Sequence, residues 1–341
     1  MFLAQSGGAI GLLQATHLAL VLSTSKVPLQ DLGQSSNSSS PSNDLTAALL
    51  VKYASCLEQD PALGIGKAFD YLRKLPTQEQ SLQEIAALVC RSIYHLDQIC
   101  GTLNNDGVRQ PGELDKYMKR EDVIIVLTKA ADNFRRGGVH EDRTKAELAA
   151  KLFMLAGKYD SLLSMLNDLI SPTDVDSDDK RYWWTQSEQF YTHYLAQPSV
   201  VLSTLESENN TRLVTTNRTL MELRHVFSSL RQEKHQEAFE IINRMQLVPL
   251  TQEEINERES KYKDLDTIVK HQFPSLLKAA VHALHGMHRR IKSEAPGVDE
   301  STSFHLKDLQ NKVRFLYIFS GLTSMPTETK EEIQRLRNNM I

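Results

Sequence analysis

The sequence predicts an all-α protein, an irregular α-solenoid of about fifteen antiparallel helices. Two observations support this fold class. Apolar residues recur at i, i+3 and i+4 over segments of about ten to twenty residues, and short Pro-, Gly- or Asn-containing breakers separate these segments. No segment reads convincingly as a strand. Contacts are then expected mainly between sequence neighbours, as in a solenoid, and no fixed repeat length is visible.

Breakers and apolar periodicity place the helices of the first half. Leu29–Asp44 is rich in Ser and Asn and is predicted to be a disordered loop. The segment from Glu121 contains a β-branched run, but its apolar residues keep the spacing of a helix and the run is too long for a typical strand. Gly157 is expected to hinge two helices. The predicted helices are Leu45–Leu57, Ala62–Leu75, Leu82–Leu96, Glu121–Phe134, Thr144–Ala156 and Tyr159–Ile170.

The second half repeats this organisation. Pro249 is expected to stop one helix, and Pro274 to stand as the first residue of another, because proline is tolerated in the first helical turn. The predicted helices are Lys180–Ala196, Ser199–Glu208, Thr211–Leu230, Lys234–Met245, Gln252–Gln272, Pro274–Ser293, Ser303–Ser320 and Thr327–Asn339. Residues 1–341 are therefore interpreted as one solenoid. The chain begins abruptly in an apolar helix, which suggests that it is one part of a longer protein.

Composition restricts the function classes. The 341 residues are 40% hydrophobic, which is enough for a substantial core. Lys+Arg 39 against Asp+Glu 43, without a basic block, argues against direct nucleic-acid binding. Cys56, Cys90 and Cys100 lack the spacing of a disulfide framework or zinc site and suit a reducing compartment. No transmembrane segment is predicted, and the apolar stretch Gly8–Leu22 is interpreted as an ordinary helix.

The segment Thr102–Glu113 has the outline of an EF-hand calcium loop. The residues at loop positions 3, 5, 6 and 12 are Asn104, Asp106, Gly107 and Glu113. Position 1 is Thr102 where an Asp is usual, and Arg109 adds positive charge where the ion would sit. We interpret the segment as a loop between helices, with a calcium sensor as the alternative.

No other segment predicts chemistry, so no catalytic, metal-binding or cofactor-binding residue and no cofactor is predicted. The phosphate-loop, HExxH and GxSxG patterns are absent. His282, His285 and His288 diverge around a helix, because each three-residue step turns the side chain by about 60°. Trp183 and Trp184 belong to an aromatic patch for which helix packing is a simpler explanation than a ligand pocket.

Four segments resemble a known family. They are NNDGVRQPGELDKY, AAKLFMLAGKYDSLLSMLNDLISP, EAFEIINRMQLVPLTQEEINER and FLYIFSGLTSMP. In this order the segments resemble the C-terminal half of the Nic/ninety-three-type nucleoporins, which form the nucleoporin interacting component family. The resemblance runs from about His17 to Ile341. On this resemblance the calcium-like segment is a connector between scaffold helices. Its turn would be shaped by Asn105, Asp106, Gly107 and Pro111.

The resemblance implies a structural scaffold subunit of the inner ring of the nuclear pore complex, at the nuclear envelope. Such a subunit has no catalysis and no cofactor, and acts by protein contacts in pore assembly and in transport of protein and mRNA. Its expected partners are other inner-ring nucleoporins, including the membrane-proximal linker nucleoporin. The alternative is a coat-like or tethering solenoid subunit of a vesicle-trafficking complex.

A partner-binding site is expected in the C-terminal third. Phe315, Phe319 and Leu322 belong to an apolar segment that covers more of the helix circumference than one packing stripe needs. A short amphipathic segment of the linker nucleoporin is expected to dock there. The alternative is that Ile333, Leu336 and Ile341 at the C-terminal end form a partial cap over this surface.

Overall fold

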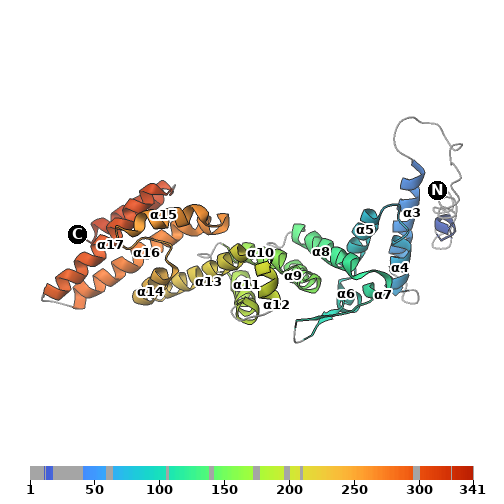
Figure 1. Ribbon diagram of the computed structural model, residues 1–341, viewed down its shortest axis with the longest axis horizontal. Helices are drawn as coiled ribbons and strands as arrows, with labels where there is room; N and C mark the ends of the chain where they lie inside the picture. The colour runs from blue at the N-terminus through green and yellow to red at the C-terminus, as the bar shows by residue number, and fades with distance from the viewer. Residues whose placement is uncertain are drawn as a thin grey trace. The chain divides into compact units, whose positions relative to one another are not determined.

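The computed structural model describes residues 11, 13–17, 41–58, 64–104, 107–137, 142–171, 177–195, 200–207, 210–294, 300–323 and 325–340. The described part of the chain is overwhelmingly helical, which confirms the predicted all-α fold (Figure 1). The described α-helices range from 4 to 28 residues, so the irregular character of the solenoid is also confirmed.

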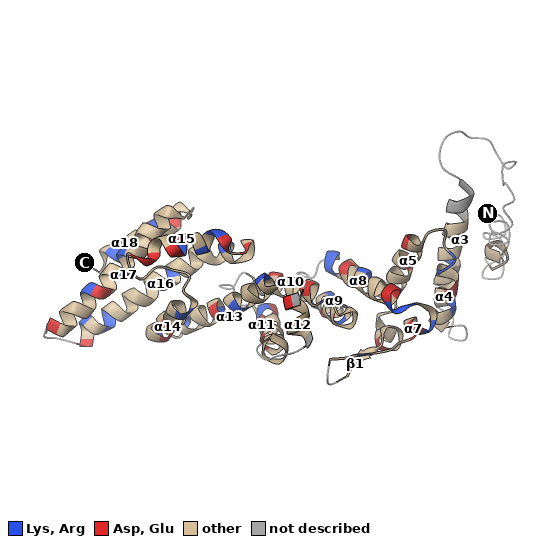
Figure 2. Ribbon diagram, viewed as in Figure 1, with Lys and Arg blue, Asp and Glu red and all other residues tan. Residues whose placement is uncertain are grey.

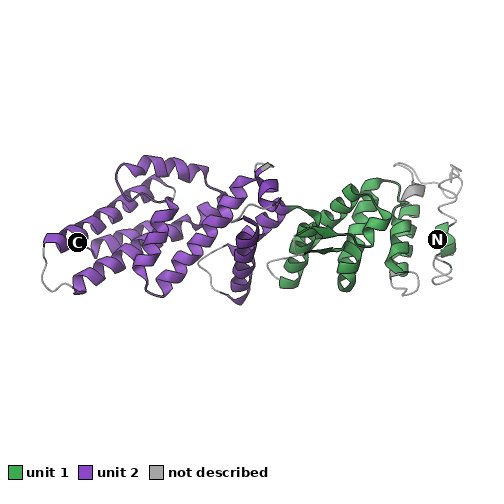
Figure 3. Ribbon diagram, turned by 60° about the horizontal axis from the view of Figure 1, so that its bottom comes forward, with its two compact units in different colours: residues 1–158 green, residues 159–341 purple. Residues whose placement is uncertain are grey.

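The chain divides into two compact units, residues 1–158 and 159–341 (Figure 3). In unit 1, α3 packs against α4, and α8 packs against both α5 and α9. The helices of this unit are α3 (Pro41–Glu58), α4 (Gly64–Leu72), α5 (Gln78–Arg91), η1 (Ile93–His95), α6 (Leu96–Cys100), α7 (Leu114–Tyr117), α8 (Arg120–Arg136) and α9 (Arg143–Ala156).

In unit 2, α13 packs against α10, α14 and α16, and α16 also packs against α14, α17 and α18. Contacts between helices close in sequence are the signature of a solenoid. The helices are α10 (Tyr159–Ile170), α11 (Asp178–Phe190), the π-helix η2 (Tyr191–Leu195), α12 (Val200–Ser207), α13 (Thr211–Arg231), α14 (His235–Met245), α15 (Glu254–Asp264), α16 (Thr267–Glu294), α17 (Glu300–Leu322) and α18 (Thr327–Asn338).

Helix α8 shows how the apolar pattern becomes a core. Its β-branched run is helical, as the spacing predicts. Glu121 and Asp122 lie in its first turn and Arg135 and Arg136 in its last, where each sign of charge is favourable to the helix dipole. The buried side chains, all at helical spacing, are Val123, Val126, Leu127, Ala130, Ala131 and Phe134.

Side-chain caps and a left-handed glycine define several helix ends. The Thr77 hydroxyl accepts from the Gln80 N–H at 3.2 Å, and the Asp142 carboxylate accepts from the Thr144 N–H at 3.0 Å. Gly157 has φ +68° and ends α9, in the conformation that a residue without Cβ adopts most easily.

Three buried polar side chains join α10, α11 and α13. The Asn217 amide Nδ2 donates to the Asn167 Oδ1 at 2.8 Å and to the Ser187 Oγ at 2.9 Å. All three residues have 0% exposure, so a shift of one helix along another would leave these groups unpaired in the core.

The largest difference from the sequence prediction concerns α15 and α16. The predicted break at Pro274 is wrong: α15 ends at Asp264, and α16 runs through Pro274. The break lies at Leu265, which is extended, and the Asp266 carboxylate accepts from the Ile268 N–H at 2.9 Å to start α16. Tertiary packing holds the helix across the proline, because Phe273 is 1% exposed between Tyr262 and Phe319.

Two smaller corrections concern the loops of unit 1. Helix α3 begins at Pro41, so the end of the predicted Leu29–Asp44 loop is helical, with proline in a first turn that needs no N–H. The rest of that loop lies outside the described residues. The prediction that the chain has no strand also fails, because Thr102–Leu103 and Arg109–Gln110 form an antiparallel pair, β1 and β2.

Replacing Pro274 with Ala should stabilise the protein. Proline inside α16 denies the Lys270 carbonyl its usual helical N–H donor, and alanine would restore it. We expect the free energy of unfolding to rise by about 1–2 kcal/mol, less than the full cost of an interior proline because proline also restricts the unfolded chain. Thermal and urea unfolding of Pro274→Ala measure this, and a lower melting temperature would show that the proline ring is needed for packing.

Candidate functional site

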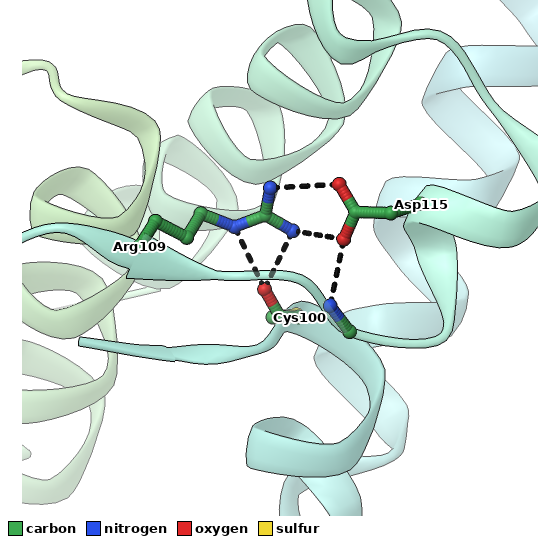
Figure 4. A network of polar contacts seen from close by, with 4 residues as sticks. Cys100, Arg109 and Asp115 are labelled. Carbon is green, nitrogen blue, oxygen red and sulfur yellow. Dashed lines mark hydrogen bonds and ion pairs between the residues drawn. The ribbon is translucent and has the colours of Figure 1, made fainter. Parts of the chain in front are cut away.

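The calcium-like segment contains a guanidinium-centred network (Figure 4). The Arg109 guanidinium donates to both carboxylate oxygens of Asp115, Nη1 to Oδ1 at 2.9 Å and Nη2 to Oδ2 at 2.7 Å. Its Nε and Nη2 also donate to the Cys100 carbonyl oxygen, at 2.9 and 2.7 Å. The Asp115 Oδ2 accepts from the Gly112 N–H at 2.7 Å. One ion pair therefore ties the end of α6, strand β2 and the start of α7 together.

Two glycines let the backbone close around this ion pair. Gly101 has φ +84°, and a Cβ there would meet the Gln110 carbonyl oxygen. A Cβ on Gly112 would lie 2.4 Å from the Gly101 nitrogen. Only glycine fits such approaches, so the hairpin is built as a rigid connector.

Of the four residues predicted to shape the turn, the structure describes Gly107 and Pro111. Gly107 has φ +76°, and its N–H donates to the Asn104 carbonyl oxygen at 3.0 Å. Pro111 is exposed, and Asn105 and Asp106 lie outside the described residues. Among the described residues of the turn, the Asn104 side-chain oxygen accepts a backbone bond, from the Val108 N–H at 2.8 Å.

The remaining groups of the segment are arranged for ion pairing within the chain. Glu113, the residue that would bind calcium with both oxygens, pairs with the Lys116 ammonium at 2.7 Å. The described residues hold no group of three or more His, Cys, Asp or Glu side chains that could share a metal ion. Burial raises the pKa of the Cys100 thiol to about 12, so this cysteine is protonated and unreactive near neutral pH.

The three predicted partner-binding residues fall into two environments on α17. Phe319 is fully buried, with its ring 6.0 Å from that of Phe273 on α16, so it offers no surface to a partner. Leu322 is 51% exposed, and Phe315 is half-buried. The buried stripe of α17 is Leu309, Val313, Leu316 and Phe319, and a second, partly covered stripe is Phe315, Ile318 and Leu322.

Helix α18 covers another side of α17 and α16. Ile333 and Leu336 are buried at 0% and 6% exposure, and the Arg337 guanidinium lies 4.6 Å from the Tyr317 ring centroid. The His282 Nε2 lies 3.0 Å from a Glu332 carboxylate oxygen, which joins α16 to α18. The amphipathic last helix thus caps α16 and α17 on this side, whereas Phe315 and Leu322 remain partly exposed. The alternative, in which the last helix covers the surface of those two residues, stays a prediction.

The histidine and aromatic clusters are also used internally. His288 is 4% exposed, whereas His282 is exposed, so these two side chains point to different surroundings. Burial lowers the pKa of both His285 and His288. Trp183 and Trp184 are buried at 5% and 6% exposure within the helical core. The sequence spacing predicted that the histidines diverge, and helix packing was the favoured interpretation of the two tryptophans.

Fold and site together define a class of protein. The chain is built of helices whose described polar side chains cap helix ends and join neighbouring elements. Acidic and basic residues are interspersed over the described helices of both units (Figure 2). A family model described as Nup93/Nic96 matches residues 3–332. The chain belongs to the Nup93/Nic96 family.

Individual relatives agree with this assignment. The chain is 27% identical over 330 residues to nuclear pore complex protein Nup93 of Danio rerio, and 26% identical to that of Xenopus tropicalis, each across 90% of this chain. It spans 38% of the length of these relatives. Among solved structures, Chaetomium thermophilum Nic96 SOL matches with a TM-score of 0.60 and 14% identity, across 95% of this chain and 52% of that one. At this identity the match establishes the solenoid fold alone.

In the part of the chain that the structure describes, no helix combines the length and apolar character needed to cross a membrane.

Replacing Asp115 with Ala should loosen the connector. The Arg109 and Asp115 side chains are 17% and 22% exposed, so the variant leaves a largely buried guanidinium with only the Cys100 carbonyl as its described acceptor. We expect a loss of about 1–3 kcal/mol of stability and faster hydrogen exchange in residues 100–116. Glu113→Ala, which removes a more exposed pair, is the matched control, and equal losses in both variants would contradict a special role for Asp115.

Proposed function

We propose that this chain is a structural scaffold subunit of the nuclear pore complex, located at the nuclear envelope, where it acts in pore assembly and nucleocytoplasmic transport. The single observation that carries the proposal is the family match, which spans nearly all of an all-helical chain. The relatives named above are nuclear pore complex proteins. No observation favours the vesicle-trafficking alternative.

The geometry supports a role through contacts and not through chemistry. A scaffold subunit needs helices held in fixed register, and the Asn167–Asn217–Ser187 network and the Arg109–Asp115 pair supply such restraints. Burial disfavours the charged forms of the Cys100 and His288 side chains: it raises the pKa of the Cys100 thiol and lowers the pKa of the His288 imidazole. We therefore propose that the chain has no catalytic activity and needs no cofactor.

The finer part of the proposal concerns partners. We propose that the chain contacts other inner-ring nucleoporins and that α17 captures a short segment of the membrane-proximal linker nucleoporin. The supporting observation is the second apolar stripe of α17, Phe315, Ile318 and Leu322, which remains partly uncovered although α18 caps another side of the helix. An amphipathic helix recognises such a stripe at i, i+3 and i+7 positions. Phe319 supports this stripe from the core.

Localisation tests the scaffold role. A fluorescent tag on the full-length protein should give a rim at the nuclear envelope that coincides with other nucleoporins. Labelling of cytoplasmic vesicles with a coat marker, without a nuclear rim, would contradict the proposal and favour the trafficking alternative.

Two variants separate binding from folding on α17. Leu322→Glu should keep the melting temperature and weaken binding of the linker nucleoporin about tenfold or more, because it places a charge on the exposed stripe. Phe319→Ala should instead lower stability by about 3–5 kcal/mol, since it empties a fully buried site. Ile125→Glu, at a site 40% exposed in unit 1, is the matched surface control.

Calorimetric titration with the purified linker nucleoporin measures the affinity of each variant, and circular dichroism measures its folding and melting temperature. Wild-type affinity in a folded Leu322→Glu protein would refute the site while leaving the scaffold role intact.

A further inference from the structure

We propose that the groove between α14 and α16 binds a basic amphipathic segment of a partner protein, anchored by an apolar side chain. The groove lies within unit 2 and has a volume of about 580 Å³. A space of this size takes a few side chains of a docked segment. It is lined by different residues from the α17 stripe, and the proposal does not depend on the nuclear pore role.

The floor of the groove is apolar. Met287 and Ile291 follow each other at one helical turn on α16, and both are only half-buried. No neighbouring helix that the structure describes fully covers this i, i+4 pair, which leaves apolar surface for a ligand. Methionine adapts its shape to varied apolar ligands. These two residues would contact the anchor.

A close helix approach forms one wall. A Cβ added to Gly286 would lie 2.4 to 2.5 Å from ring atoms of His235, so only glycine lets the first turn of α14 come this near to α16. The His235 Nδ1 is buried and has no hydrogen-bond partner among the described residues, so packing holds this ring in place. This wall of the groove is therefore set by the packing of the His235 ring against the Gly286 backbone.

The rim carries an excess of negative charge. Its carboxylates are Glu233, Glu237, Glu240 and Glu294, whereas its Lys and Arg residues are Lys234 and Arg290. Both cations already have partners: Lys234 lies 3.7 Å from Glu237, and Arg290 lies 2.7 Å from Glu294. Glu233 and Glu240 remain without a cation among the lining residues. This charge pattern attracts Lys or Arg side chains and repels nucleic acid or an acidic peptide.

An exposed aromatic residue lies on a neighbouring helix. Phe304 of α17 is 71% exposed, and helical spacing puts it on the face of Asp308 and Lys312. The Lys312 ammonium lies 5.9 Å from the ring centroid of Phe239 on α14, so this face of α17 is turned toward α14. A partner segment longer than the groove would find further apolar surface here.

Two synthetic peptides serve as probes. Both are helical, of about sixteen residues, with the same leucines at i, i+3 and i+4; one carries Lys on its polar face and the other carries Glu at the same positions. Fluorescence anisotropy with the whole chain should show the Lys peptide binding at least about tenfold more tightly than the Glu peptide. Equal affinities, or no binding of the Lys peptide, would overturn the proposal.

Charge reversal locates the site. The double variant Glu233→Lys, Glu240→Lys should invert the preference between the two peptides, and Ile291→Asp should weaken the Lys peptide about tenfold. The matched control, Glu328→Lys, Glu331→Lys, changes two exposed glutamates of α18 and should leave the preference unchanged. If control and groove variants behave alike, the binding is general surface attraction and the groove is not its site.

Self-association is the competing occupant. Sedimentation velocity of the wild-type chain should give the same species as Ile291→Asp. A wild-type dimer that Ile291→Asp dissociates would show that a second copy fills the groove, and would overturn the assignment to a basic partner segment. Circular dichroism confirms that each variant is folded before its affinity is interpreted.

Discussion

The longer helices that the structure describes each bury an apolar stripe, and a helix close in sequence within the same unit packs against it. Helix α8 is the clearest case, with its stripe enclosed between α5 and α9. Burial of apolar area dominates the free energy of folding, but it is non-directional and does not choose among similar packings. A chain organised in this way depends on local neighbours for stability and on other interactions for register.

Sparse polar contacts supply that register. The buried amides of Asn167 and Asn217 meet Ser187 and allow only one alignment of α10, α11 and α13. The Arg109 and Asp115 pair fixes the connector between α6 and α7, where two glycines remove the steric barrier to close backbone contact. The segment Thr102–Glu113, which resembles a calcium-binding loop, is thus held together by the guanidinium of its own Arg109.

The surfaces that remain uncovered give a scaffold its specificity. On α17 the buried stripe and the accessible stripe run side by side, so one helix contributes both to the core and to a candidate docking surface. Between α14 and α16 the acidic rim adds charge selection to an apolar floor. An apolar stripe and an acidic groove would let a scaffold distinguish partners by shape and charge.

The sequence by itself determined where most helices lie, that they are irregular in length, and which family the chain resembles. Those features are local: a 3.6-residue period, a proline or a glycine is visible in a short window. Tertiary structure alone decided that α16 continues through Pro274, because the packing of Phe273 between Tyr262 and Phe319 outweighs the lost hydrogen bond. It also decided that Phe319 is core while Leu322 is exposed. Periodicity shows that a helix has apolar stripes, but which stripe is covered depends on neighbours that approach from elsewhere in the chain.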